Sequence, residues 1–176
     1  MWLLVCGSAD LVQPMRRLLA LDQSSKITGW SVFDNQQNLI DFGHFTITDS
    51  DIGVRLEKIR NEVARLISDY DIDYLIMEDI QYQPNVGGNI QTFKVLAEVF
   101  GVIYELATEL DIPSSSVLAA QWRSVVGIKG KVRVEQKKNA QQYISKTYAL
   151  TPTEDEADSI CIGIYYFKSQ NNYNWE

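Results

Sequence analysis

The order of apolar segments along the chain constrains the fold more than any other feature of the sequence. Three strand-like segments come first, and helical and strand-like segments alternate after them. That order, β-β-β-α-β-α-β-α, predicts an α/β fold with a mixed five-stranded sheet flanked by helices, antiparallel strands first and parallel crossovers after. Strands are expected at residues 17–22, 27–34, 38–47, 73–80 and around 115–118, and helices at 52–69, roughly 89–110, 119–126, 134–148 and 154–168.

The domain organisation follows from the length and from the two ends. A chain of 176 residues suits one domain with its own core, which we expect over residues 15–170, followed by a tail at 171–176. Residues 1–14 show no sustained period and end in Pro14. We interpret them as a dispensable leader or a start-site artefact; the alternative is an extra edge segment packed on the fold.

The composition and the two cysteines indicate where in the cell the protein works. A hydrophobic fraction of 45% and a charged fraction of 22% are ordinary for a soluble globular protein. No apolar stretch approaches the ~20 residues that a membrane span needs. We interpret Cys6 and Cys161 as free thiols in a reducing compartment, which predicts a cytoplasmic location without membrane association.

Four acidic residues stand where they could converge. Asp22 ends one apolar run and Glu78 ends another, while Asp155 and Asp158 lie three residues apart where a helix should begin. Clustered carboxylates are the ligands that Mg²⁺ requires. Two such ions about 3.5–4 Å apart clamp the attacking and leaving oxygens of a phosphodiester. The pattern predicts a metal-dependent nuclease.

Each acid also has a plainer interpretation. An aspartate after a strand, such as Asp22, is often a strand terminus or a cap. Thr153 and Glu156 fit a capping box, and acids in a first helical turn favour the helix dipole. Neither explanation covers Asp158, which lies beyond the cap, on the same face as Asp155. An acid directly after a buried strand, such as Glu78, is costly unless it is paired.

The net charge of −7 is unevenly distributed. Residues 121–138 hold six cations against one anion, a local balance of +5. A basic strip beside an acidic pocket fits a nuclease better than a general DNA coat, because phosphate binding is largely electrostatic. The cations are Arg123, Lys129, Lys131, Arg133, Lys137 and Lys138.

These segments resemble the RuvC-type Holliday junction resolvases of the ribonuclease H-like superfamily. The resemblance covers about 15–168 and is carried by LALDQSSKITGWSVF, LIMEDIQ, SVVGIKGKVRVEQKKNAQQYI and DEADSICIGIYY. It implies an endodeoxyribonuclease that cuts four-way junctions and other branched DNA by two-metal-ion hydrolysis. Two Mg²⁺ ions, with Mn²⁺ as an alternative, would be bound by Asp22, Glu78, Asp155 and Asp158.

The same resemblance implies partners and further site residues. The small size resembles phage-encoded members, which act in the bacterial cytoplasm and for which no branch-migration motor is assumed. Which of the lysines and arginines at 129–138 serves the family's lysine role stays open. Tyr82 is the candidate for an aromatic that wedges into the junction, or else a loop tyrosine covering the sheet edge. Gln81 and Arg123 are candidate DNA contacts.

The long helix at 89–110 carries apolar residues on more than one face. A surface helix needs one apolar stripe, so the excess predicts burial against both the sheet and a second subunit, with Gly101 permitting close approach. A C2 homodimer is therefore expected; the alternative is a monomer that encloses the helix fully.

Two other function classes fit parts of the pattern. An actin-like ATPase half shares the strand arrangement but needs a Gly-rich phosphate turn after Asp22, where Gln23 and Ser24 stand, and a second lobe. A non-catalytic protein that binds branched DNA is the main alternative, although it would gain nothing from four clustered acids.

Overall fold

A computed structural model describes residues 15–82 and 89–171, so the predicted leader and most of the predicted tail lie outside the described residues. The strands are β1 (Arg17–Asp22), β2 (Ile27–Asp34), β3 (Leu39–Thr46), β4 (Tyr74–Glu78) and β5 (Ser114–Val117). The helices are α1 (Ile52–Asp69), α2 (Ile90–Glu109), α3 (Ala119–Val126), α4 (Arg133–Tyr148) and α5 (Glu154–Asn171).

The sheet has the predicted mixed arrangement. Its strand order is β3-β2-β1-β4-β5. The pairs β1/β2 and β2/β3 are antiparallel, whereas β1/β4 and β4/β5 are parallel. The prediction of a five-stranded α/β fold of ribonuclease H type is therefore confirmed, and the α5 helix runs three residues further than expected. In the described residues, no helix combines the length and apolar character of a membrane span.

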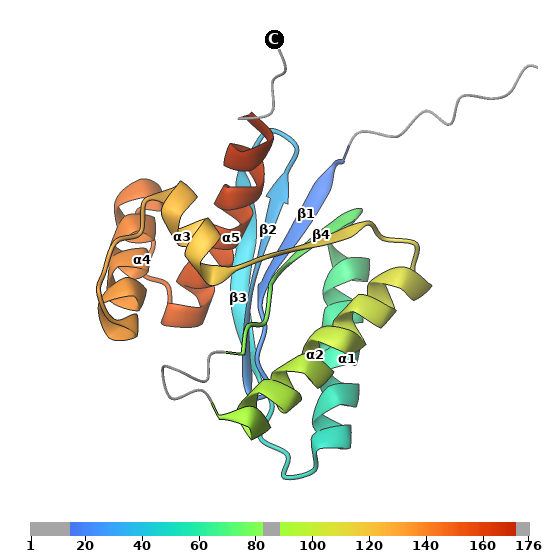
Figure 1. The fold of residues 1–176 in the computed structure, drawn as a ribbon. Coiled ribbons are helices and arrows are strands. Elements are labelled where there is room, and N and C mark those ends of the chain that lie inside the picture. The colour runs from blue at the N-terminus through green and yellow to red at the C-terminus, as the bar shows by residue number, and fades with distance from the viewer. Residues whose placement is uncertain (1–14, 83–88, 172–176) are drawn as a thin grey trace, which may run out of the picture.

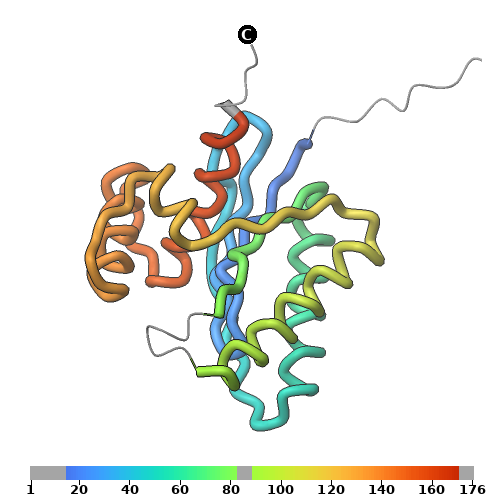
Figure 2. Tube along the Cα trace, viewed as in Figure 1, coloured from blue at the N-terminus to red at the C-terminus, as the bar shows by residue number. Residues whose placement is uncertain are grey.

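Helices cover both faces of the sheet, α1 and α2 on one side and α3, α4 and α5 on the other (Figure 1). The tube trace shows the same two sets of helices on either side of the sheet (Figure 2). The alternation of side chains in β1 determines which residue faces which layer. Leu19 and Leu21 pack with the α1/α2 core, and Leu18 and Ala20 pack with the α3/α4/α5 core. Asp22 continues the second set and therefore belongs to the α5 side.

Helix α5 docks unusually closely on β2. A Cβ atom placed on Gly29 would lie 2.0 Å from the carbonyl oxygen of Asp155, so only glycine lets the first turn of α5 approach this strand. Further along, the Ser31 hydroxyl donates to the carbonyl of Ser159 over 3.0 Å. Gly29 pairs with Asp22 in the sheet. The same contact therefore brings Asp155 close to the end of β1.

The first turn of α5 is fixed by the predicted capping box. The Thr153 hydroxyl accepts from the Glu156 amide over 3.3 Å, and the Glu156 carboxylate accepts from the Thr153 amide over 2.7 Å. The other Glu156 oxygen lies 2.7 Å from Nδ1 of His44 on β3. His44 is exposed, and its contact with Glu156 ties the edge strand to this turn.

Substitution of Gly29 by alanine should displace the first turn of α5. We expect Gly29→Ala to lower the free energy of unfolding by about 1–3 kcal/mol, because the added methyl group overlaps backbone that cannot move cheaply. Urea unfolding measures this loss. Ile27→Ala, at the exposed start of the same strand, is the control and should cost less than about 1 kcal/mol. Equal, small losses in both variants would show that α5 does not depend on this contact.

Candidate active site

Asp22 and Glu78 end two neighbouring parallel strands. The register pairs Leu21 with Met77, the residues immediately before these acids. Because parallel strands place their carboxyl ends at the same sheet edge, the two carboxylates lie side by side there. Ile76 packs in the α5-side core, so alternation directs Glu78 toward the same layer as Asp22.

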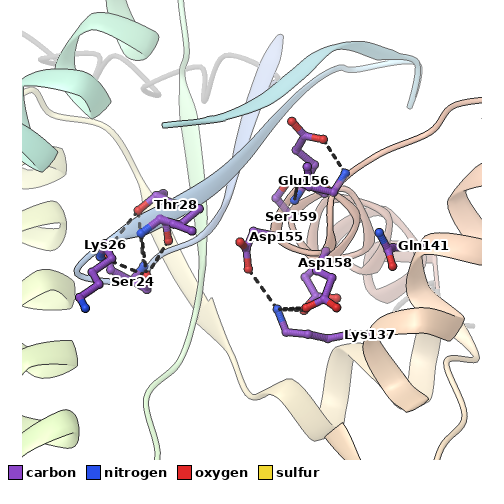
Figure 3. Close-up of polar contacts among 12 residues, drawn as sticks. Ser24, Lys26, Thr28, Lys137, Gln141, Asp155, Glu156, Asp158 and Ser159 are labelled. Atoms are coloured by element: carbon purple, nitrogen blue, oxygen red, sulfur yellow. Dashed lines mark hydrogen bonds and ion pairs between the residues drawn. The ribbon is translucent and has the colours of Figure 1, made fainter. Parts of the chain in front are cut away.

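The turn after Asp22 is well ordered by short polar side chains. The Ser24 hydroxyl donates to the Ile27 carbonyl over 2.6 Å and accepts from the Lys26 and Ile27 amides (Figure 3). The Thr28 hydroxyl donates to the carbonyl of Ser24 over 3.3 Å. This network holds the end of β1 in place without the Gly-rich turn that a phosphate-cradling loop needs.

Helix α5 supplies two further carboxylates, and α4 supplies a buried cation between them. Lys137 Nζ lies 3.0 Å from Asp155, 3.7 Å from Asp158 and 3.6 Å from Glu154. Asp155 and Asp158 point to the same side of α5, toward Lys137, whereas Glu156 points away (Figure 3). The predicted i, i+3 pair therefore shares one face.

Glu78 is held by two residues that the sequence did not single out as its partners. The indole Nε1–H of Trp122 donates to Glu78 Oε2 over 2.8 Å. The side-chain amide of Gln23 donates to the Glu78 carbonyl oxygen over 2.6 Å. Trp122 and Gln23 are both buried. The position and orientation of this glutamate are thus fixed from α3 and from the end of β1.

The crowding of negative charge shifts the acid–base equilibria of the site. Burial, and then the charges of Glu78 and Asp158, raise the pKa of Asp22 well above its usual value. Burial raises the pKa of Asp158 to about 6, although the positive charges of Lys137 and Arg123 oppose that shift. For Lys137, burial alone lowers the pKa, but the bond with Asp155 and the charges of Asp158 and Asp22 outweigh it and raise the pKa.

The donor set suits a hard divalent cation. Asp158 Oδ1 is buried and accepts no hydrogen bond in the described residues, a costly condition that a cation would relieve. All four predicted donors are carboxylates, the ligands that Mg²⁺ prefers. As the side chains stand, no three acidic, histidine or cysteine groups in the described parts of the chain are placed to hold one ion together. The chemistry of the four carboxylates, with the unpaired Asp158 Oδ1 among them, fits a divalent cation.

Apart from Arg123, which is half-buried, the predicted DNA-contact cations divide into two groups. Lys129, Lys131, Arg133 and Lys138 are exposed, whereas Lys137 is 8% exposed and sits among the acids. The loop before α4 is held down on this helix. Asn139 donates to the Lys129 carbonyl over 2.8 Å, and the Lys131 amide donates to Glu135 over 2.8 Å. The exposed cations therefore stand on a fixed surface.

A cavity of about 440 Å³ opens beside Glu78 and gathers several predicted contacts. Gln81, Arg123 and Arg133 line it together with Glu78. Tyr82 is 41% exposed, and its ring packs 5.4 Å from that of Phe93 at the start of α2. The structure thus places Gln81 and two arginines in the cavity beside Glu78, and Tyr82 against the start of α2.

Helix spacing distinguishes Lys137 from its neighbour. Ala140 and Ile144 are fully buried, and Lys137 lies three and seven residues before them, on the same face of α4. Lys138 falls off that face and is exposed. This periodicity is present in the sequence and identifies the inward lysine. No comparable pattern marks Trp122 or Gln23, because their contacts cross between separate elements.

A mixed sheet of this order, with carboxylates at the carboxyl ends of β1 and β4 and on the facing α5, is the arrangement expected of a ribonuclease H-like nuclease. The family model "Crossover junction endodeoxyribonuclease RuvC" matches residues 18–166, so the chain belongs to that family. The predicted family and enzyme class are thereby confirmed.

Individual proteins similar to this chain are also RuvC endonucleases or Holliday junction resolvases. The crossover junction endodeoxyribonuclease RuvC of Shewanella sediminis is 27% identical over 161 residues, covering 90% of each chain. That of Fusobacterium nucleatum is also 27% identical, over 87% of this chain and 80% of the relative. Among solved structures, Thermus thermophilus RuvC in complex with a Holliday junction substrate has a TM-score of 0.72 at 11% identity, covering 89% and 96% of the chains. The yeast mitochondrial Holliday junction resolvase Ydc2 has a TM-score of 0.57 at 16% identity, covering 91% and 82%. These two structures share the fold.

The raised pKa of Asp158 predicts how stability depends on pH without metal. Because its pKa is about 6 in the folded protein and near 3.8 in the unfolded chain, the folded state binds more protons between these values. Stability should therefore fall as pH rises from about 4 to about 6, and the full cost should remain at pH 7. Asp158→Asn should stabilise the metal-free protein at pH 7 by on the order of 2 kcal/mol.

Thermal unfolding in chelator, at several pH values, measures this effect. Added Mg²⁺ should stabilise the wild type and act less on the variant, because a predicted ligand is removed. A metal-free variant that is no more stable than the wild type at pH 7 would contradict the account of Asp158 as a costly buried charge.

Proposed function

We propose that this chain is a metal-dependent endonuclease that cleaves Holliday junctions and other branched DNA. The observation that carries the proposal is the meeting of Asp22, Glu78, Asp155 and Asp158 beside the buried Lys137, in a chain of the RuvC family. Three separate elements supply these acids at one edge of the sheet. The relatives named above are crossover junction endodeoxyribonucleases, which supports the choice of substrate.

In this proposal the four carboxylates hold two Mg²⁺ ions, with Mn²⁺ as an alternative. Bound divalent ions supply an activated water and stabilise the oxygen that leaves the phosphodiester. Gln23 fixes the backbone of Glu78, and the capped first turn of α5 holds Asp155 and Asp158 toward the strand ends. Lys137 contributes a fixed positive charge that offsets the acids and stabilises negative charge developing on the phosphate.

Branched DNA would lie across the basic face of α3 and α4. The exposed Lys129, Lys131, Arg133 and Lys138 provide phosphate contacts, which position DNA without reading its sequence. Gln81 and Arg123 line the cavity through which the backbone reaches Glu78. Tyr82 stays our candidate for stacking on an unpaired base at the branch point.

A homodimer is part of the proposal because a four-way junction carries two equivalent strands to cut. Val99, Ile103, Leu106 and Ala107 are the buried face of α2. Another side of the helix presents Tyr104, 55% exposed and stacked on Phe100, and no atom of the described residues lies within 4 Å of a Cβ placed on Gly101. An uncovered aromatic surface of this kind fits a twofold interface.

The acids argue against a protein that binds branched DNA without cutting it. Buried carboxylates next to a DNA surface repel phosphate and destabilise the fold, so a pure binder gains nothing by keeping them. We place the activity in the cytoplasm, where the free, buried thiol of Cys161 stays reduced.

Removal of any one of the four carboxylates tests the catalytic claim. The variants are Asp22→Asn, Glu78→Gln, Asp155→Asn and Asp158→Asn. Each should abolish cutting of an end-labelled four-way junction in Mg²⁺, and each should spare or tighten junction binding because a negative charge near phosphate is lost. Linear duplex is the substrate control and should stay intact. Tight junction binding by the wild type with no cutting under any divalent ion would support the non-catalytic alternative.

The adjacent lysines 137 and 138 form a matched pair of test positions. Lys137→Met should slow cutting by about 10²-fold with junction affinity kept, since its ammonium acts inside the acidic site. Lys138→Met should leave the cleavage rate of the bound junction unchanged. It should lower the number of counterions released on binding by about one, as seen in the salt dependence of junction affinity. Single-turnover kinetics measure the cleavage rate of each variant, and binding titrations at several salt concentrations measure its junction affinity. Equal effects of both variants on the cutting rate would contradict the role of Lys137.

Charge introduced on the exposed side of α2 tests the dimer. The wild type should sediment at twice the mass of one chain, and Tyr104→Asp should sediment as a monomer that keeps its fold. Val125→Asp, on an exposed apolar position of α3, is the control and should stay dimeric. A wild type that is monomeric at micromolar concentration would refute this interface.

A further inference from the structure

Trp122 is buried in an unusual way for a core tryptophan. Its side chain is fully enclosed, yet the one polar atom it carries is bonded to an acid of the candidate active site, Glu78, over 2.8 Å. The indole N–H is a donor only, so its partner must be an acceptor. A buried tryptophan usually finds such a partner, but a backbone carbonyl would serve for packing alone.

The bond defines the direction of the Glu78 carboxylate. A hydrogen bond to an ionised oxygen is shorter and stronger than one between neutral groups, and this one engages Oε2 alone. The backbone of Glu78 is fixed independently by Gln23. With main chain and Oε2 both held, the direction of Oε1 is determined, so the glutamate is oriented before any cation binds.

Arg123 restrains the indole itself. Its guanidinium carbon lies 4.6 Å from the centre of the Trp122 ring, within the range of a cation–π contact. Arg123 also lines the cavity beside Glu78. The short helix α3 therefore brings a hydrogen-bond donor and the cation that stacks on it to the same acid.

We propose that Trp122 is a positioning residue that holds the Glu78 carboxylate in the orientation in which it binds a divalent cation. The inference rests on the proposed function, since it takes Glu78 to be a cation ligand. It extends that function by assigning a role to a tryptophan that would otherwise count as core. Groups that orient metal ligands typically contribute 10–100-fold to metal affinity, as an order of magnitude.

The first test replaces Trp122 by phenylalanine, which keeps an aromatic ring in the core and removes the N–H. Binding of Mn²⁺ to the intact protein is measured by calorimetry, beside thermal unfolding. Trp122→Phe should bind Mn²⁺ about 10-fold or more weakly. Phe33→Leu, a similar loss of volume in the same core but away from Glu78, is the control. It should lose stability and keep wild-type Mn²⁺ affinity.

A double-mutant cycle shows whether Trp122 acts through Glu78. In the Glu78→Gln background, adding Trp122→Phe should cause no further loss of Mn²⁺ affinity, because the group it orients is already altered. If Trp122→Phe weakens binding by the same factor with and without Glu78, the positioning role is refuted.

The indole proton gives a readout that a purely structural tryptophan would not. Its ¹H–¹⁵N resonance, assigned by its absence in Trp122→Phe, should shift and saturate as Mg²⁺ is added, and should not shift in Glu78→Gln. A wild type that binds no divalent ion would contradict the proposed function. A wild type that binds Mg²⁺ with an unmoved Trp122 resonance and unchanged affinity in Trp122→Phe would overturn this inference alone.

Discussion

The approach of α5 to β2 at Gly29 is the contact on which the rest of the site depends. The backbone of Asp155 lies where any larger residue would place its Cβ. Gly29 is also the sheet partner of Asp22. One close contact therefore brings acids that are more than 130 residues apart in sequence to the same edge. The Thr153–Glu156 capping box and the bond from Ser31 to Ser159 keep the helix in that position.

Bringing the carboxylates of α5 close to those at the strand ends has an electrostatic cost. Asp22 and Asp158 both have pKa values raised by burial and by their acidic neighbours, so the metal-free site destabilises the fold at neutral pH. Lys137 offsets part of that cost with one buried positive charge near three carboxylates. A divalent cation would offset more of it. The site resembles other functional sites in which strain or charge is retained because activity requires it.

The sequence predicted the strands, the helices and the mixed sheet, because periodicity and element order carry that information. The alternation in RLLALD and in YLIME puts Asp22 and Glu78 on the strand faces opposite Leu21 and Met77, but the sequence did not show which helices cover that face. The order of elements and the capping box were also predicted from the sequence, since both depend on local spacing. The helix at 154–171 was predicted too short at its end, where local signals are weakest.

The sequence did not predict the side-chain contacts between separate helices and strands. Nothing local relates Trp122 to Glu78, 44 residues earlier, or Gln23 to the backbone of the same glutamate. Among the basic residues, only the spacing of Lys137 to Ala140 and Ile144 separates the inward lysine from the exposed ones. The dimer stays a prediction, because an uncovered helix surface shows where a partner fits without showing the partner.

Diffraction from crystals grown in Mn²⁺ tests the central claim most directly, because the anomalous signal of manganese locates each ion without reference to any assumed mechanism. The account predicts anomalous peaks bounded by Asp22, Glu78 and the carboxylates of α5, with Lys137 still beside Asp155. Fully ordered carboxylates at saturating Mn²⁺ with no anomalous peak among them would contradict it, and would make these acids a structural feature of the fold.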